Sequence, residues 1–224
     1  MLTVMLDLTW TGPDGNVAVI TMDDGENRFD LSVVRRWHEL LDEVQAKEGP
    51  LALVTTGTGK FYSNGLDLDW MTANPDSSRE FLRGLFRVWG RILGLDCLTV
   101  AAVNGHAFGA GALLTSAHDR IVMRADRGYW CMPELDLGLP VADPMLRLLL
   151  ARLPRTAIIR AVNTGHRFTG PDALAAGIAD EIRPEDEVLP AAVEWLTPLA
   201  SKSREVLSTH KHLLHAATIE MLGN

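Results

Sequence analysis

Cysteine is scarce in this sequence. Its two cysteines, Cys97 and Cys131, lie far apart and form no CxxC pair. A disulfide scaffold and a cysteine-based zinc site are therefore not expected, and two free thiols are typical of a reducing cytoplasm. Long apolar runs are also missing, because every hydrophobic stretch is interrupted well before membrane-spanning length. Residues 1–5 lack the basic start and apolar run of a signal peptide. We therefore expect a cytoplasmic protein that binds neither a membrane nor a metal.

Positive charge is in deficit. The chain of 224 residues has 21 Lys and Arg against 29 Asp and Glu, a formal net charge of −8. Nucleic-acid binding needs a basic surface to displace counterions, so it is not expected. A small anionic ligand is still compatible with a few local Lys or Arg residues. No linker, charge block or low-complexity run divides the chain, so residues 1–224 are expected to form one globular domain.

Strands and helices are predicted to alternate along the first two thirds of the chain. Strands are expected at 17–22, 51–55, 98–103, 121–124 and 129–132, with 57–65 as a loop. Helices are expected at 33–44, at 82–93, from the turn at 105–111 through Ala117, and over most of the chain from Pro144. Asp30 or Ser32 can cap the first of these helices. This order predicts an α/β fold with a helical C-terminal region.

Two glycine-containing loops each follow a predicted strand. They span residues 59–68 and 104–111, and the second runs into a helix. Glycine lets a backbone come close to a ligand, and one N–H from each loop aimed at a single point would form an oxyanion hole. Taken singly, each loop is better explained as a tight turn. Neither matches a dinucleotide fingerprint or a phosphate loop.

Glu134 is a third candidate, within the apolar segment WCMPELDLGLP. A carboxyl group in apolar surroundings has a raised pKa, which suits proton transfer near neutral pH. In isolation, a surface glutamate at the end of a strand is the simpler interpretation.

Four segments in one order carry a resemblance to a known family. They are KFYSNGLDL, AAVNGHAFGAGALLTSAHDRIVMRAD, MPELDLGLP and TGHRFTGPDALAAGIAD. Together they resemble the crotonase, or enoyl-CoA hydratase/isomerase, superfamily, from about Val17 to about Ala217. The resemblance implies a superhelix of stacked β-β-α units over about residues 1–143. It also implies a mainly helical region over about 144–224 that covers the active site and forms homotrimers or dimers of trimers.

The resemblance also implies catalytic roles. The oxyanion donors fall on the backbone N–H groups of Leu66 and Ala110, and the catalytic carboxylate falls on Glu134. Hydratases of the family carry a second glutamate where this chain has Leu113. Leucine cannot activate water, so the chain is most similar to the single-glutamate isomerases that convert 3-enoyl-CoA to 2-enoyl-CoA.

Coenzyme A is expected to bind as part of the substrate, an acyl-CoA thioester, with no separate cofactor. By the same resemblance, its contacts are expected from Asn27, Arg28, Lys60, Phe61, Asn64, Gly65, Asp67, Gly109 and Lys211. Lys211 would reach the nucleotide phosphate. Leu113 and Asp143 are candidates for the acyl pocket, and Asp143 is equally a candidate cap for the helix that starts at Pro144.

Other interpretations stay open at this point. The protein could be a hydratase or another crotonase-type acyl-CoA enzyme, or a non-catalytic acyl-CoA-binding or assembly protein. His106 is a candidate acid or base, although a packing or loop-fixing role suits its position beside the second loop better. Ser63 raises the idea of a serine hydrolase, but no GxSxG motif accompanies it.

Overall fold

The computed structural model describes residues 5–223. The first four residues, on which the expectation about a signal peptide rests, and Asn224 lie outside this range. Within the described range, no helix has both the length and the apolar character needed to cross a membrane.

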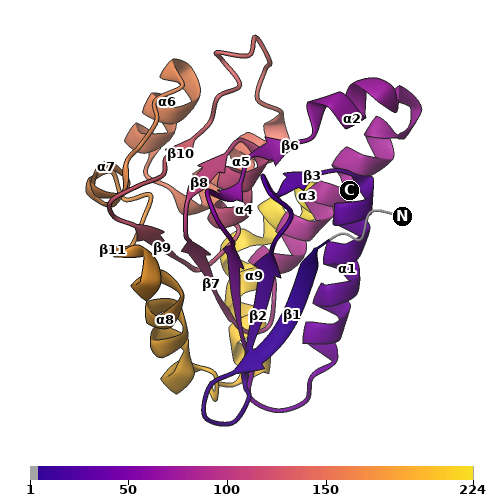
Figure 1. Cartoon of the computed structure of the whole chain (residues 1–224). Helices are drawn as coiled ribbons and strands as arrows, with labels where there is room; N and C mark the ends of the chain where they lie inside the picture. The colour runs from indigo at the N-terminus through magenta and orange to yellow at the C-terminus, as the bar shows by residue number, and fades with distance from the viewer. Residues whose placement is uncertain (1–4, 224) are drawn as a thin grey trace.

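A mixed sheet of six strands forms the centre of the molecule, in the order β1-β2-β4-β7-β9-β11 (Figure 1). Its strands are β1 (Leu6–Thr11), β2 (Val17–Met22), β4 (Ala52–Gly57), β7 (Leu98–Val103), β9 (Arg120–Arg124) and β11 (Glu181–Arg183). β1 pairs antiparallel with β2, and every other pairing is parallel. Parallel neighbours need helical crossovers, which explains why helices cover the sheet.

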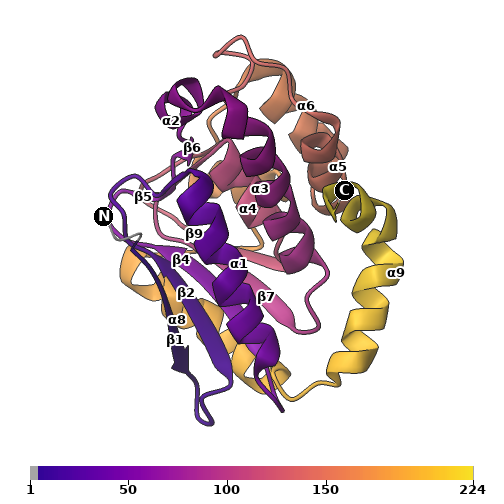
Figure 2. The ribbon, with the colours of Figure 1, turned by 90° about the vertical axis from the view of Figure 1, so that its right-hand side faces the viewer.

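The helices lie on both faces of this sheet (Figure 2). They are α1 (Leu31–Ala46), α2 (Leu68–Ala73), α3 (Ser78–Leu93), α4 (Ala110–Ser116), α5 (Asp143–Arg152), α6 (Arg155–Thr164), α7 (Gly170–Ala175), α8 (Glu185–Leu196) and α9 (Arg204–Gly223). α8 packs on β4, β7 and β9, while α1, α3 and α9 pack together on the other side.

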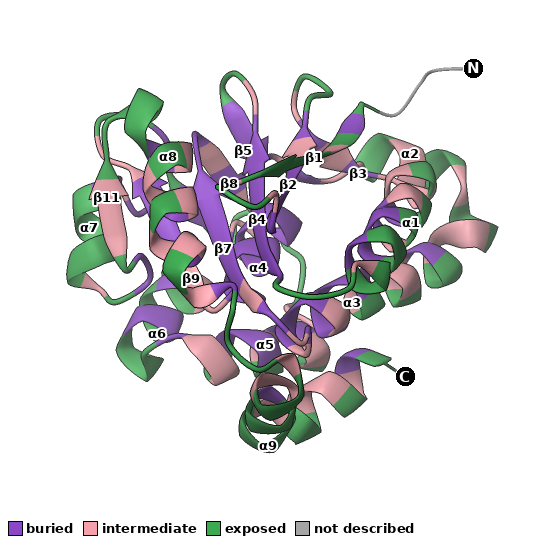
Figure 3. Cartoon of the chain, turned by 90° about the horizontal axis from the view of Figure 1, so that it is seen from below, coloured by how far each residue is buried: buried purple, intermediate pink, exposed green. Residues whose placement is uncertain are grey.

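Alternate residues of each central strand serve the two cores. In β7, Ala101 and Val103 join the large cluster shared with α1, α3 and α4, whereas Val100 and Ala102 join the smaller cluster under α8. This is the two-residue periodicity of a strand buried on both faces. Figure 3 shows the central strands as the most buried part of the molecule.

Most of the predicted elements are confirmed, with Asp30 as the cap of α1, where its carboxylate accepts from Val33 N–H at 2.8 Å. The loop expected at 57–65 is wrong in part, because it contains β5 (Phe61–Ser63) and the start of β6 (Gly65–Leu66). β1, α2 and β11 were not predicted. Three-residue and two-residue strands leave too little pattern to read, and β11 places an edge strand of the main sheet within the mainly helical region.

Two short parallel sheets sit at one end of the molecule. β10 (Trp130–Cys131), β8 (His106–Phe108) and β5 form the first, in that order. β3 (Arg28–Phe29) and β6 form the second. These short strands hold the loops that the sequence singles out.

Candidate active site

The first short sheet brings the three candidate segments to one edge. β8 pairs with β10 through Ala107 and Trp130, and with β5 through His106 and Phe61. All three strands are parallel, so their carboxyl ends meet at the same edge. Residues 64–66 follow β5, Gly109 follows β8, and Glu134 follows β10 by two intervening residues.

Glycine allows the first two segments to touch. Gly65 has φ +91°, and a Cβ on it would lie 2.8 Å from Phe108 O and 3.5 Å from Ala110 N. Gly109 has φ 50° and ψ −113°, a conformation open essentially to glycine alone. It starts α4, so the Ala110 N–H is at a helix start and has no partner inside the helix. The backbones that carry Leu66 N–H and Ala110 N–H therefore lie side by side, as an oxyanion hole requires.

Glu134 faces the same turn. A Cβ on Gly109 would lie 3.3 Å from its Oε1. Oε2 is buried and has no hydrogen-bond partner within the described part of the chain. Burial raises the pKa of the Glu134 carboxyl, and a hydrogen bond from its own backbone N–H opposes this shift only in part. A half-buried carboxylate with one unpartnered oxygen is suited to take up and release a proton.

Leu113 lies one turn beyond Ala110 in α4. Its side chain is fully buried in the large hydrophobic cluster, and its N–H donates to Gly109 O at 3.0 Å. An apolar residue therefore occupies the position at which hydratases of the family that this chain resembles carry a carboxylate.

Three of the residues expected to contact coenzyme A have side chains engaged within the protein. Asn27 is buried, and its backbone has φ 52°. Its side-chain amide donates to Phe61 O at 3.0 Å and to Tyr62 O at 3.2 Å. Asn64 donates to Glu26 Oε2 at 2.9 Å, and Asp67 caps α2 through Trp70 N–H at 2.9 Å. These side chains shape the first loop, and Asn64 and Asp67 remain partly exposed beside it.

Arg28, Lys60 and Phe61 lie beside this loop. The Arg28 guanidinium pairs with Glu26 at 2.6 Å and with Asp69 at 3.9 Å. Lys60 is exposed, with Nζ 5.0 Å from the centre of the Phe61 ring. Lys60 thus brings positive charge to one side of the candidate site, whereas the charge of Arg28 is offset by Glu26 and Asp69.

The interpretation of Lys211 as a phosphate ligand is wrong. Its side chain is buried, and Nζ donates to Asp119 Oδ2 at 2.9 Å and to Cys97 O at 3.1 Å. A lysine that neutralises a nearby carboxylate in the interior cannot also extend to a phosphate in solvent.

Asp143 and His106 also have defined surroundings. Asp143 is exposed, is the first residue of α5 rather than its cap, and lies 3.4 Å from Arg147. The His106 ring packs against Phe61, Phe108 and Tyr129, and its Nδ1 accepts from Tyr129 N–H at 3.2 Å. The loop-fixing role expected for His106 is confirmed.

Ser63 has no hydrolase-like arrangement. Its Oγ donates to Asn27 O at 2.7 Å and accepts from Gly65 N–H at 3.2 Å. Both bonds fold the first loop. Three side chains joined behind this loop were not predicted from the sequence: Tyr62, Thr55 and His118. For Thr55 in β4 and Tyr62 in β5, a polar group within a buried strand is the one signal that could have pointed to them, whereas His118 lies between α4 and β9 and gives no such signal.

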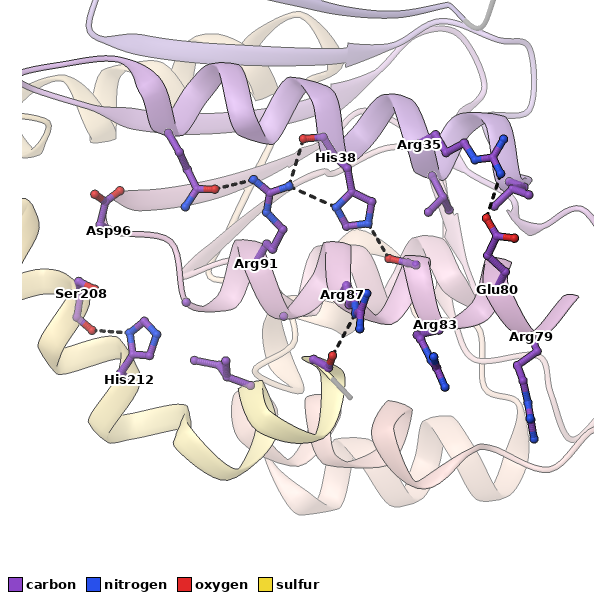
Figure 4. Close-up of a pocket in the computed structure, with 18 of the residues that line it drawn as sticks. Arg35, His38, Arg79, Glu80, Arg83, Arg87, Arg91, Asp96, Ser208 and His212 are labelled. Carbon is purple, nitrogen blue, oxygen red and sulfur yellow. Dashed lines mark hydrogen bonds and ion pairs between the residues drawn. The ribbon is translucent and has the colours of Figure 1, made fainter. Parts of the chain in front are cut away.

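A cavity of about 1180 Å³ lies elsewhere, between α1, α3 and α9 (Figure 4). Four arginines of α3 line it at intervals of four residues: Arg79, Arg83, Arg87 and Arg91. Arg91 is already paired with Asp42 at 2.6 Å, and Arg87 donates to Gly223 O at 3.0 Å. None of the three candidate segments lines this cavity. The geometry at the ends of β5, β8 and β10 therefore remains the basis for locating the candidate active site.

Comparison with known proteins gives consistent matches. A family model described as enoyl-CoA hydratase/isomerase matches residues 13–223. Enoyl-CoA delta isomerase 2, peroxisomal, of Arabidopsis thaliana is 33% identical, over 93% of this chain and 92% of that protein. Enoyl-CoA delta isomerase 3 of the same plant is 31% identical, with the same coverage of both chains.

A solved structure is similar in fold. The apo structure of an enoyl-CoA isomerase of Mycobacterium tuberculosis superposes with a TM-score of 0.89 at 28% sequence identity. The match covers 99% of this chain and 95% of the other.

Proposed function

The chain belongs to the enoyl-CoA hydratase/isomerase family, and we propose that it isomerises 3-enoyl-CoA to 2-enoyl-CoA with Glu134 as its single base. It is an enzyme of the crotonase superfamily. The observation that carries the proposal is the half-buried Glu134 carboxylate, whose Oε2 is buried without a partner among the described residues and whose Oε1 faces the turn between Gly109 and Ala110. Coenzyme A enters as part of the acyl thioester and leaves with it.

The mechanism follows from these groups. The thioester oxygen lies between Leu66 N–H and Ala110 N–H, and Glu134 removes a proton from C2. The negative charge moves to the thioester oxygen, where each N–H stabilises it by about 3 kcal/mol. Protonated Glu134 then delivers a proton to C4, which gives the conjugated product. The raised pKa of Glu134 suits both transfers, because it makes the carboxylate a stronger base toward C2 while the protonated carboxyl can still deliver its proton to C4.

The surroundings support binding of the remaining substrate groups. We expect Lys60 to attract the phosphates of coenzyme A and Arg28 to contribute from its pair with Glu26, with Phe61, Gly65 and Gly109 shaping the surface between them and Glu134. Asn27, Asn64 and Asp67 contribute through the loop they hold. Leu113 would form part of an apolar wall behind the acyl group. Asp143 is exposed and would lie at the edge of the acyl pocket.

We expect Glu134→Gln to lower kcat by about 10² to 10⁴ while leaving acyl-CoA binding unchanged. Glutamine keeps the shape and loses the base. In the wild type, kcat/KM should fall as the pH drops through the raised carboxyl pKa, because only the ionised form accepts a proton. Steady-state kinetics across pH, with binding by calorimetry, check both.

The same substitution removes a charge from a buried site, so the free energy of unfolding at neutral pH should not decrease. Urea unfolding of the variant is therefore the control for misfolding. Turnover near that of the wild type would exclude Glu134 as the base.

We expect hydration of 2-enoyl-CoA to be about 10² to 10⁴ times slower than isomerisation of the chain-matched 3-enoyl-CoA. Hydration needs a water held by a second acid or base, and Leu113 offers none. Leu113→Glu should raise hydration relative to isomerisation, whereas the size-matched control Leu113→Gln should not. Equal rates of the two reactions in the unmodified protein would replace the isomerase assignment by a hydratase one.

We also propose a homotrimer or a dimer of trimers in the cytoplasm. The outer face of α9 supports assembly, since Leu213 and Leu214 are 77% and 76% exposed. The free, buried thiols of Cys97 and Cys131 support a reducing compartment. Light scattering of the purified protein should give the mass of a trimer or twice that mass, and Leu213→Glu should lower the measured mass. Cell fractionation should recover the protein in the cytosol. A monomer at micromolar concentration, or recovery outside the cytosol, would contradict the proposal.

A further inference from the structure

Three polar side chains form a buried chain of hydrogen bonds behind the site. Thr55 Oγ1, on β4, lies 2.7 Å from the Tyr62 hydroxyl and 3.0 Å from His118 Nε2. Thr55 and Tyr62 are fully buried, and His118 is 1% exposed. Polar groups this deep depend on one another for their hydrogen bonds, so breaking one link leaves the others unsatisfied.

The direction of these bonds is fixed at the histidine. His118 Nδ1 lies 2.8 Å from Leu114 O, and because a carbonyl only accepts, Nδ1 carries the hydrogen. Burial lowers the pKa of His118 to about 4, so the ring is neutral at neutral pH and Nε2 is bare. Thr55 therefore donates to His118, and Tyr62 donates to Thr55.

One end of the chain is the first loop of the site. Tyr62 belongs to β5, its carbonyl accepts from Asn27 at 3.2 Å, and the next residue is Ser63. Ser63 Oγ accepts from Gly65 N–H at 3.2 Å, one residue before Leu66. Fixing the Tyr62 ring thus fixes the start of the segment that carries the Leu66 N–H.

The other end is the helix that carries the second donor. His118 bonds to Leu114 O, one turn beyond Ala110 in α4. The same helix is crowded against the first loop, since a Cβ on Gly111 would lie 2.5 Å from Ser63 O. The buried chain therefore ties the two donor segments together from the interior.

We propose that His118 is a positioning residue for the oxyanion hole, which holds the Leu66 segment against α4 through Thr55 and Tyr62. The inference rests on the proposed function, because it assigns the two N–H groups to one thioester oxygen. It gives the buried histidine and tyrosine a role in catalysis, because a small relative shift of two preorganised donors weakens their hold on the transition state.

The test uses threonine substitutions in the full-length protein. Thr55→Val keeps the shape and removes both links, and should lower kcat about tenfold with KM nearly unchanged, less than the loss of about 10² or more for deleting a donor. Thr55→Ser should restore kcat. The matched control is Thr56→Val, one residue along the same strand, where the hydroxyl donates to Ala102 O at 2.9 Å and contacts no part of the site.

The outcomes separate the possible roles. Unchanged kcat in Thr55→Val, or equal losses in Thr55→Val and Thr56→Val, would overturn the positioning role. Absence of turnover in the wild type on a panel of acyl-CoA thioesters would remove the proposed function and the positioning role together. Turnover on that panel with an unaffected Thr55→Val removes the positioning role alone.

Nitrogen NMR of the His118 ring gives a readout without turnover. We expect a protonated Nδ1 and a bare Nε2 at neutral pH, with the Nε2 resonance shifted in Thr55→Val and restored in Thr55→Ser. A proton on Nε2 would contradict the order of donors on which the inference depends.

Discussion

Parallel hydrogen bonding among β5, β8 and β10 places the ends of three distant segments at one edge, and the chemistry of the protein depends on that edge. Each strand has only two or three residues, so their alignment depends on support from behind. Asn27 supplies part of it by binding two carbonyls of β5, and His106 supplies another part by packing between Phe61 and Tyr129.

Two local features of the same edge are energetically unfavourable. Glu134 Oε2 is buried without a partner among residues 5–223, which disfavours the charged form and raises the pKa of the carboxyl. Gly109 is held in a backbone conformation that other residues avoid. The two large hydrophobic clusters on either side of the main sheet stabilise the fold against these local penalties. The burial of Glu134 provides a base with a raised pKa, and the conformation of Gly109 directs a backbone N–H toward the substrate.

The sequence predicted the parts of this arrangement that depend on local pattern. Strands such as 98–103 and the cap at Asp30 follow from residue types within a few positions, and the resemblance singled out Leu66, Ala110 and Glu134, whose segments the fold brings together. Contacts between distant residues were not predictable in this way. Lys211 meets Asp119 across 92 positions, and His118 meets Thr55 across 63. A basic residue in a C-terminal helix therefore had the same appearance in sequence whether it faced a phosphate or a buried carboxylate.

The central claim is that one carboxylate carries a proton from C2 to C4, and isotope transfer tests it most directly. A 3-enoyl-CoA with deuterium at C2 is converted in ordinary water, and the product is examined by mass spectrometry and NMR. The account predicts deuterium at C4 in part of the product, because the group that removes the deuteron from C2 is the same group that delivers a proton to C4. Product formed at the normal rate with no deuterium at C4, at any extent of conversion, would mean that the deuteron removed from C2 is not carried to C4, and would contradict the account.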